Sequence, residues 1–384
     1  MKKLSFKTVS VKILSFILMV CIMASVMPMQ LIAEGIDNLS SGSEQSQGGA
    51  QELPLPDISD ILDNVVDDAI DDILKPDDSS GSGNDSGSDF NIKDNVPTGE
   101  TETAENTVQF RLNKDGKSYS VVGFLSSGDT LVIPETYTSE KHGTLPVTRI
   151  EEFAFQNKTN LVNVTIPSSI EYIGTEAFSG CDNLKFEKYG NANYLGNDVN
   201  KYLYLHSAVS ADITEVDIHN DTKFIGSYAF LNCKSLTEIS VPESVKQIGF
   251  KAFRHTDKLE KITLPFVGEM GVGEENSHFG YIFGAQTFGG NISYVPTSLR
   301  EVVILGGERL TKGSFYGMDM IESLTLPFVG ATKNGTENTH ISYIYGYDDY
   351  NGNANLPASL TDITILSGDI GAYAFYYCTG LERP

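Results

Sequence analysis

The chain has 384 residues, with 51 acidic and 27 basic side chains and a formal net charge of −24. A surface this acidic repels phosphate backbones and anionic lipid, which argues against nucleic acid and membrane surfaces as partners. The sequence shows no Gly-x-Ser-x-Gly, phosphate-loop or His-Glu-x-x-His motif, so we predict no catalytic residue, metal site or cofactor in it.

Residues 1–33 have the features of a secretion signal. Four lysines within the first twelve residues give a positive start, and the mostly apolar run at 13–27 is too short for a comfortable membrane span. We expect cleavage after Ala33, which leaves a mature chain without a membrane span. An uncleaved anchor is the alternative. The predicted location is extracellular, either secreted or on the cell surface.

Residues 34–103 are dominated by Ser, Gly and Asp. Such a segment buries too little apolar area to offset its ordering entropy, so we predict a disordered acidic spacer. Between Pro56 and Pro76, apolar residues at helical spacing predict a short amphipathic helix at 57–75. Two interpretations of this helix stay open: a docking helix for a partner groove, or a transient helix that folds back onto the repeats.

Residues 104–147 differ from the repeats that follow them. Alternating strands are predicted at 108–112 and 119–124, and the turn between them contains Asp115-Gly116, a strong hairpin signal. Residues 131–134 then resemble the first repeat strand. We interpret this region as an N-terminal β-hairpin cap that seals the edge of a repeat array.

From residue 148 onward a short signature recurs: a hydrophobic residue, Gly, two variable residues and Ala-Phe, as at 248–253. A short unit cannot bury its own apolar face and must stack on its neighbours, so the signature predicts a solenoid. The aromatic residue that ends each copy is a predicted core residue: Phe155, Phe178, Phe230, Phe253, Phe315 and Phe375.

Each unit opens with an alternating strand, such as 161–167 or 236–242. In the second example Leu236, Ile239 and Val241 are predicted to face the core. The proline that follows closes the strand because it has no N–H to donate. Later in the same unit, Gly249 is predicted to permit a close approach of two backbones.

The pattern Leu-x-x-Ile-x-Ile-Pro-x-x-Val-x-x-Ile-Gly-x-x-Ala-Phe-x-x-Cys resembles the BspA-like leucine-rich repeat family of bacterial surface proteins, over residues 108–381. The resemblance implies a right-handed leucine-rich repeat solenoid, mostly β with short helical or irregular return segments. It also implies a secreted or surface-displayed protein that contacts host proteins or other cells, and no catalytic residue. The departures are Met318 at a cysteine position and the lost Ile-Gly pair before Phe155 and Phe315.

Three cysteines lie three residues after a repeat Phe: Cys181, Cys233 and Cys378. Thr256 and Met318 occupy the same position in other copies, which is typical of packing, so we predict free thiols in the core. A disulfide is the alternative. A metal site is not expected, because the cysteines lie one or more repeats apart.

Three insertions interrupt the repeats, at 185–214, 266–295 and 328–356. The first predicts an extra turn plus a strand, and the other two duplicate each other at an offset of 61 to 62 residues. Tyrosines on Gly- and Asn-rich segments resemble adaptable binding surfaces. The candidate ligand-binding residues are Phe279, Tyr281, Phe283, Tyr294, Tyr343, Tyr345, Tyr347 and Tyr350. The alternative is small hairpins on the solenoid flank with their aromatic side inward.

His278 and His340 hold equivalent positions, each three residues after Glu275 or Glu337. This spacing invites a metal interpretation, but residues at repeat-equivalent loop positions more often serve a turn or a side-chain hydrogen bond, and we predict that role. Residues 348–353 are predicted to form a turn, because their acids do not alternate as a calcium loop requires.

The chain ends at Pro384, where the next repeat strand should begin, and we interpret it as a fragment of a longer protein. The predicted function is adhesion or protein–protein binding. The expected partner is a protein or glycoprotein, such as host extracellular matrix, mucin or another bacterial surface. The alternative is a targeting or substrate-binding region of a larger secreted enzyme whose catalytic domain lies beyond residue 384.

Overall fold

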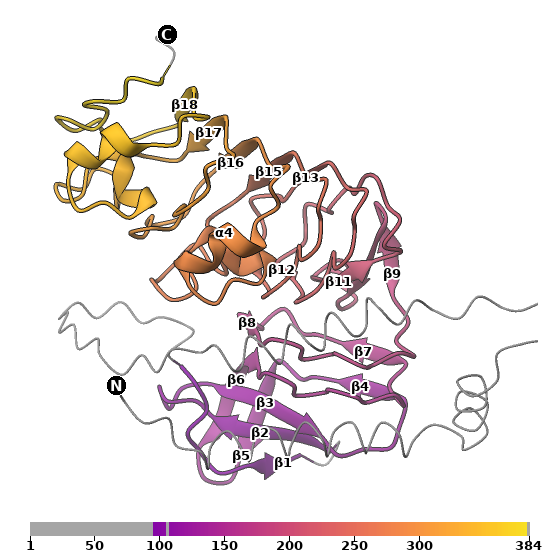
Figure 1. Ribbon diagram of the computed structural model, residues 1–384. Coiled ribbons are helices and arrows are strands. Elements are labelled where there is room, and N and C mark those ends of the chain that lie inside the picture. Colours follow the sequence, from indigo (N-terminus) through magenta and orange to yellow (C-terminus); the bar gives the residue numbers. More distant parts are fainter. Residues whose placement is uncertain (1–94, 105–106, 382–384) are drawn as a thin grey trace, which may run out of the picture. The chain divides into compact units, whose positions relative to one another are not determined.

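The computed structural model describes residues 95–104 and 107–381, which form short strands and a few short helical turns (Figure 1). The predicted signal, most of the predicted spacer and the helix expected at 57–75 lie outside the described residues. In the part of the chain that is described, no helix has the length and apolar character that a bilayer crossing requires.

The N-terminal cap is a mixed sheet built around the predicted hairpin. The two expected strands pair antiparallel, and further strands flank them in the order β1-β2-β3-β6-β5. The bounds of these strands are Glu102–Thr103 (β1), Val108–Leu112 (β2), Tyr119–Phe124 (β3), Thr136–Ser139 (β5) and Gly143–Ile150 (β6). Because β6 runs parallel to β3 and also pairs with the next repeat, the hairpin is continuous with the repeat array.

The cap begins earlier than the sequence predicted. The N–H groups of Thr98 and Gly99 donate to the Leu112 carbonyl at 3.0 and 3.1 Å, and Pro97 forms a bridge to Asn113. The boundary placed at residue 103 therefore lies inside this sheet. Residues 95–103 attach mainly through backbone hydrogen bonds, so their polar composition did not distinguish them from a spacer.

From residue 130 onward the chain winds in coils, and each coil adds a strand to a parallel ladder. Ile239, Ile262 and Val302 lie opposite one another in three successive coils, with their side chains in the core. The strands of this first wall are β4 (Thr130–Val132), β7 (Asn163–Thr165), β13 (Glu238–Ser240), β15 (Lys261–Leu264), β16 (Glu301–Ile304), β17 (Ser323–Leu326) and β18 (Asp362–Ile365). The predicted inward set Leu236, Ile239 and Val241 is buried, which confirms the alternation.

A second wall consists of two-residue strands that end just before the repeat glycine. These are β8 (Tyr172–Ile173), β12 (Phe224–Ile225) and β14 (Gln247–Ile248). A Cβ atom on Gly249 would lie 2.4 Å from the backbone nitrogen of Ser227 in the preceding coil. The predicted close backbone approach is therefore confirmed, and any side chain at this position would push two coils apart.

The Ala-Phe turns close the coils and stack the phenylalanines. Phe155 donates its N–H to the Ala177 carbonyl at 2.9 Å, and Phe230 does the same to Ala252 at 2.7 Å. The rings of successive turns also stack: those of Phe230 and Phe253 lie 5.3 Å apart and are nearly parallel. All six predicted core phenylalanines except Phe375 are fully buried. Phe375 is half-buried because the described residues place a coil on only one side of it.

A recurrent serine, which the sequence analysis missed, ties each strand to the coil before it. It stands two residues after the repeat proline, and its hydroxyl donates to a backbone carbonyl of the preceding coil at 2.6 to 2.8 Å. The four donors are Ser169, Ser244, Ser298 and Ser359. Because this bond spans two coils wherever it occurs, Pro-x-Ser is a sequence signal for stacking.

The first insertion divides the array. It forms an antiparallel three-stranded unit, where one strand and an extra turn were predicted, with bounds Glu187–Tyr189 (β9), Ala192–Leu195 (β10) and Tyr204–Ala208 (β11). Strand β11 pairs parallel with β12 and continues the second wall. Because β10 occupies the other edge of β11, β8 does not pair with it, and the buried side chains separate into two clusters on either side of this unit.

Candidate functional site

The two duplicated insertions are parts of long coils, where the sequence suggested flanking loops. Strands β13, β15, β16, β17 and β18 begin at residues 238, 261, 301, 323 and 362, so successive coils span 23, 40, 22 and 39 residues. The additional residues form short helical turns: η2 (Phe279–Phe283), η3 (Phe288–Gly290), α4 (Asn291–Tyr294), η4 (Ile341–Tyr345) and η5 (Tyr350–Asn355). The expectation of small hairpins was therefore wrong.

In the long coils, helical turns take the place of the Ala-Phe turn. The N–H of Phe253 donates to the Ile282 carbonyl at 2.8 Å, and the N–H of Phe315 donates to Ile344 at 2.7 Å. An ordinary Ala-Phe turn accepts the same bond from the phenylalanine N–H of the preceding coil. At the end of η2, Gly284 adopts a φ of 118°, a left-handed conformation that lets the backbone reverse there.

Four of the predicted ligand-binding aromatics are core residues: Phe279, Tyr281, Phe283 and Tyr345. Phe283 lies 6.1 Å from Phe253, and Phe279 lies 5.4 Å from Phe315, so the insertion rings continue the phenylalanine stack. Because these four side chains are buried in the core, they cannot contact a ligand, and they are no longer candidate binding residues. The alternative of an inward aromatic side describes them correctly.

The remaining four predicted residues differ in exposure. Tyr294 is half-buried, with the Arg254 guanidinium 5.2 Å from its ring, and Tyr343 is half-buried beside His340. Tyr347 and Tyr350 are exposed. Only these two of the eight predicted residues are therefore exposed, at 36% and 37%.

Both insertion histidines make hydrogen bonds inside their own coil. His278 Nε2 lies 3.0 Å from the Ala285 carbonyl, and His340 Nδ1 lies 2.8 Å from the Ser342 hydroxyl. Burial lowers the pKa of His340, which favours the neutral ring. The predicted hydrogen-bonding role agrees with these contacts. In the described part of the chain, no three His, Cys, Asp or Glu side chains gather as metal ligands would.

An exposed group of rings, which we name the aromatic patch, lies on the four coils that begin with β15, β16, β17 and β18. Its members have exposed fractions of 36% to 56%: Phe288, Tyr316, Tyr347, Tyr350, Tyr373, Tyr376 and Tyr377. Phe288 meets Tyr316 edge-on at 5.8 Å, and Tyr350 stacks on Tyr373 at 4.8 Å. Equivalent insertion positions thus place a ring against the turn of the next coil in both duplicated units.

The two halves of the aromatic patch are adjacent. A Cβ atom on Gly346, which directly precedes Tyr347, would lie 3.3 Å from the ring of Tyr316. On the other side, Tyr376 contacts both Tyr350 and Tyr373. Exposed aromatic rings that contact one another form a preorganised apolar surface, because their side chains have little conformational freedom left to lose on binding.

The sequence analysis missed most of the aromatic patch because it lies on turn residues. Tyr373 and Tyr377 stand two residues before and after Phe375, and both have positive φ values, 64° and 67°. Other turns carry Phe153, Glu176, Tyr228 or Lys251 at the first of these positions, and Asn157, Asn232 or His255 at the second. The available signal was the presence of three tyrosines around one repeat phenylalanine, since no other copy has more than one aromatic residue at these positions.

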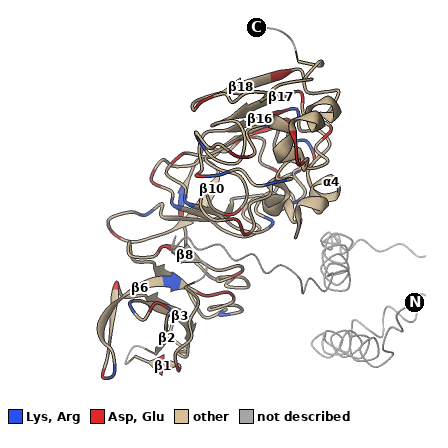
Figure 2. Ribbon diagram, turned by 90° about the vertical axis from the view of Figure 1, so that its left-hand side faces the viewer, with Lys and Arg blue, Asp and Glu red and all other residues tan. Residues whose placement is uncertain are grey.

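The exposed face of the first wall has a different character, with paired charges. Lys261 Nζ lies 3.6 Å from Glu238 and 3.1 Å from Glu301, and Arg300 pairs with Glu322 at 3.2 Å. Figure 2 shows acidic and basic residues interspersed along these coils. Exposed pairs of this kind contribute little stability, but they keep the wall polar, so the aromatic patch is the more apolar surface.

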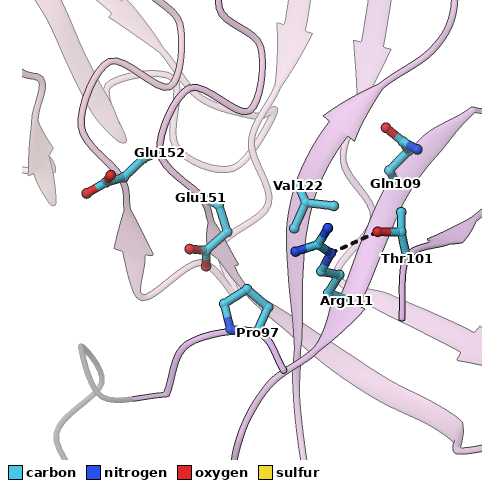
Figure 3. Close-up of a pocket in the computed structure, with 7 residues that line it drawn as sticks. All are labelled: Pro97, Thr101, Gln109, Arg111, Val122, Glu151 and Glu152. Carbon is cyan, nitrogen blue, oxygen red and sulfur yellow. Dashed lines mark hydrogen bonds between the residues drawn. The ribbon is translucent and has the colours of Figure 1, made fainter. Parts of the chain in front are cut away.

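A polar cavity of about 420 Å³ lies beside the cap (Figure 3). Arg111 lines one side and donates to Thr101 Oγ1 at 2.8 Å, while Glu151 lines another and accepts from Ser120 and Arg149. Burial and the neighbouring Glu151 raise the pKa of Glu152. Since Arg111 and Glu151 already have partners in the cap, we regard the aromatic patch as the stronger candidate site.

The cysteines lie where the packing interpretation put them. Cys181 and Cys233 are buried and free, and Cys378 is free and half-buried in the last coil. Burial raises the pKa of the Cys233 thiol to about 11, so it is protonated at neutral pH.

A comparison with protein families decides what kind of repeat this is. The family model described as BspA type Leucine rich repeat region matches in six copies, with residues 198–268 matched. The chain carries BspA-type leucine-rich repeats. The predicted family resemblance and the leucine-rich repeat fold are confirmed. Repeats of this kind generally bind proteins. No curated protein matches the chain.

Three solved structures with leucine-rich repeats are similar to this chain. A leucine rich cell surface protein from Faecalibacterium prausnitzii A2-165 is 20% identical, with 74% of this chain and 54% of that chain covered and a TM-score of 0.29. The T. pallidum leucine-rich repeat protein is 19% identical, with 70% and 83% covered and a TM-score of 0.25. A Bacteroides ovatus ATCC 8483 leucine-rich repeat protein is 20% identical, with 73% and 81% covered and a TM-score of 0.28. The match spans about half of the Faecalibacterium protein.

Proposed function

We propose that this chain is a secreted or surface-displayed protein that binds a protein or glycoprotein partner through the aromatic patch. The observation that carries the proposal is the recurrence of exposed, mutually contacting rings at equivalent positions of two duplicated units. Tyrosine is a frequent anchor of protein interfaces because it combines a large apolar ring with a hydroxyl.

The extracellular location is part of this proposal. It is supported by the positive and then apolar N-terminal segment, and by repeats of the BspA type. Expression of the full chain in a bacterial host with an intact secretion system tests it. We expect secreted protein whose first residue is Glu34. Retention of residues 1–33 on a protein that stays inside the cell would contradict the proposal.

Binding is tested with the full chain against a panel of extracellular matrix proteins, mucins and bacterial surfaces. A patch variant carries Phe288→Ser, Tyr316→Ser and Tyr350→Ser. A matched control variant removes exposed apolar side chains elsewhere, with Leu125→Ser, Val199→Ser and Val209→Ser. We expect the patch variant to lose at least about tenfold in affinity, equal to about 1.4 kcal/mol, and the control to bind as wild type does. Equal affinities for all three proteins would overturn the proposal.

A further inference from the structure

A hollow of about 410 Å³ lies at the break between the two core clusters, and it shares no residue with the aromatic patch. We name it the junction pocket. Val245 and Phe266, which line it, belong to one core cluster, whereas Glu171 on its rim directly follows Ile170 of the other. Ligand pockets form preferentially where separately packed parts of a protein meet.

The interior of the junction pocket is apolar. Phe266 and Met270 line it, together with Val245 and Val272. Val272 is half-buried, and the other three side chains are buried. A methionine thioether adapts to irregular apolar shapes and makes favourable contacts with aromatic rings. This lining therefore suits a large apolar group.

The duplicated coil carries larger polar side chains at the corresponding place. Lys333 and Asn334 stand where the first copy has Gly271 and Val272, at an offset of 62 residues. Asn334 Oδ1 accepts the N–H of Asp369 at 2.9 Å in the second copy. In the first copy, the backbone carbonyl of Gly271 accepts the equivalent bond, from the N–H of residue 308 at 2.8 Å.

The surroundings of two equivalent glycines show the consequence. A Cβ atom on Gly368 would lie 3.4 Å from Lys333 Cγ and 3.4 Å from Asn334 Oδ1. A Cβ atom on Gly307, which lines the junction pocket, would meet only Phe266 and the Gly271 carbonyl within 4 Å. The first copy therefore lacks the two side chains that occupy this space in the second.

The rim of the junction pocket carries an excess of negative charge. Glu171, Lys246 and Glu308 are all exposed. Within residues 95–104 and 107–381, none of these three side chains forms an ion pair. Because two carboxylates face one ammonium, the rim attracts a basic group, while the Lys246 ammonium can donate to a peptide carbonyl.

The two sides of the rim are held together before any ligand binds. Gln247 directly follows Lys246, and its side-chain amide bonds both the N–H and the carbonyl of Ile173, at 3.0 and 2.9 Å. Ile173 lies two residues after Glu171. A rim positioned in this way loses little conformational freedom on binding, which favours affinity.

We propose that the junction pocket binds a segment of a protein partner in which a large apolar side chain is followed by a basic one. The apolar side chain packs against Phe266 and Met270, and the basic side chain pairs with Glu171 or Glu308. The inference rests on the proposed function for the class of partner, but it uses a surface separate from the aromatic patch.

Methyl NMR on the full chain, with isotope-labelled methionine methyl groups, tests the proposal. The probe is the dipeptide acetyl-Phe-Arg-amide, and the control is acetyl-Phe-Glu-amide. The loss of one signal in Met270→Leu assigns the Met270 methyl group. We expect the probe to shift this signal saturably, and the control to bind at least about tenfold more weakly.

Two variants separate the apolar and the charged contributions. Gly271→Lys/Val272→Asn gives the first copy the side chains of the second, and we expect at least about tenfold weaker probe binding. Glu171→Gln/Glu308→Gln should abolish the preference for the basic dipeptide. The matched control Glu135→Gln/Glu140→Gln neutralises two exposed carboxylates of the cap and should bind as wild type does.

Three results would overturn the proposal: no saturable shift of the Met270 signal, equal affinities of the wild type for both dipeptides, or unchanged probe binding in Gly271→Lys/Val272→Asn. Thermal unfolding checks that this variant folds, and if it does not, the Glu171→Gln/Glu308→Gln variant decides. The triple variant of the aromatic patch should retain probe binding, so a failure of the proposed function and a failure of this inference give different results.

Discussion

The side-chain amide of Gln247 takes the place of a neighbouring strand at Ile173, 74 residues earlier in the chain. Its Oε1 accepts the Ile173 N–H at 3.0 Å, and its Nε2 donates to the Ile173 carbonyl at 2.9 Å. The same Nε2 reaches Glu269 Oε1 at 3.0 Å. Because β8 does not pair with β11, this amide satisfies a buried sheet edge at the break between the two core clusters.

Replacement of Gln247 should therefore destabilise the whole array. Gln247→Met keeps the length of the side chain but leaves the buried N–H and C=O of Ile173 without partners, and we expect a loss of about 1–3 kcal/mol in the free energy of unfolding. Urea denaturation measures it. Gln156→Met, at an exposed glutamine, is the control and should stay within about 0.5 kcal/mol of wild type. Equal effects of the two substitutions would refute the structural role of Gln247.

In the two long coils, the buried side-chain amides of Asn291 and Asn353 also hydrogen-bond to backbone groups. Asn291 accepts from Gly280 N–H at 2.9 Å and donates to the Ser314 carbonyl at 3.1 Å, and it is fully buried. Asn291→Ala should cost about 1–3 kcal/mol, because two backbone groups lose their partner. Asn220→Ala, at an exposed position, should change stability by less than about 0.5 kcal/mol. Matching unfolding midpoints for both variants would contradict this assignment.

The phenylalanine stack predicts a gradient of mutational cost along the chain. Phe253 is fully buried between the rings of Phe230 and Phe283, so Phe253→Ala should cost about 3–5 kcal/mol. Phe375→Ala removes a half-buried ring and should cost less than half as much. Thermal and urea unfolding of both variants test the gradient. A larger loss for Phe375→Ala would show that the last coil is packed differently.

The repeat core was predictable from the sequence because it depends on local periodicity. Leu236, Ile239 and Val241 alternate along the sequence, which predicts the strand. A glycine recurs at the position of Gly249 in every copy that has an Ile-Gly pair, so the close backbone approach and the core ring that follows it could also be predicted from spacing. Contacts between distant residues were not predictable in the same way. Nothing near Gln247 or Ile173 in the sequence indicates that the two meet, since their contact depends on how the β9–β11 unit interrupts the second wall.

The candidate site was only partly predictable for a related reason. Tyr281 and Tyr350 lie on similar Gly- and Asn-rich segments, yet one is buried and the other is exposed. Composition marks both segments as aromatic, but the side that faces the core depends on the helical turns that replace the expected hairpins. Tyr373 and Tyr376 were overlooked because they flank a core residue, and both rings are exposed in the structure.

His206 makes stability depend on pH. Burial lowers its pKa from 6.5 to about 4, and its Nδ1 atom is enclosed without a hydrogen-bond partner among the described residues. Between pH 6.5 and 4 the unfolded chain therefore binds a proton that the folded chain does not, so stability falls as the pH is lowered through this window. The slope approaches about 1.4 kcal/mol per pH unit.

The contribution of this residue can be isolated with His206→Phe, which keeps an aromatic ring beside Phe186 and Tyr204. Unfolding free energies of wild type and variant are compared from pH 7 to pH 4. We expect the difference between them to shift in favour of the variant as the pH falls, because the variant has no proton to exclude. Parallel curves over the whole range would disprove the role of His206.

The amide hydrogen exchange of Phe253 and Phe315 tests the central structural claim most directly. The acceptors of these two N–H groups, the carbonyls of Ile282 and Ile344, lie within the two duplicated insertions. If the insertions are coils of the array, both amides are protected to the same degree as Phe155 and Phe230, whose acceptors lie in ordinary turns. Exchange at the rate of an unstructured peptide would mean that the insertions are loops outside the array, and the aromatic patch would lose its structural basis.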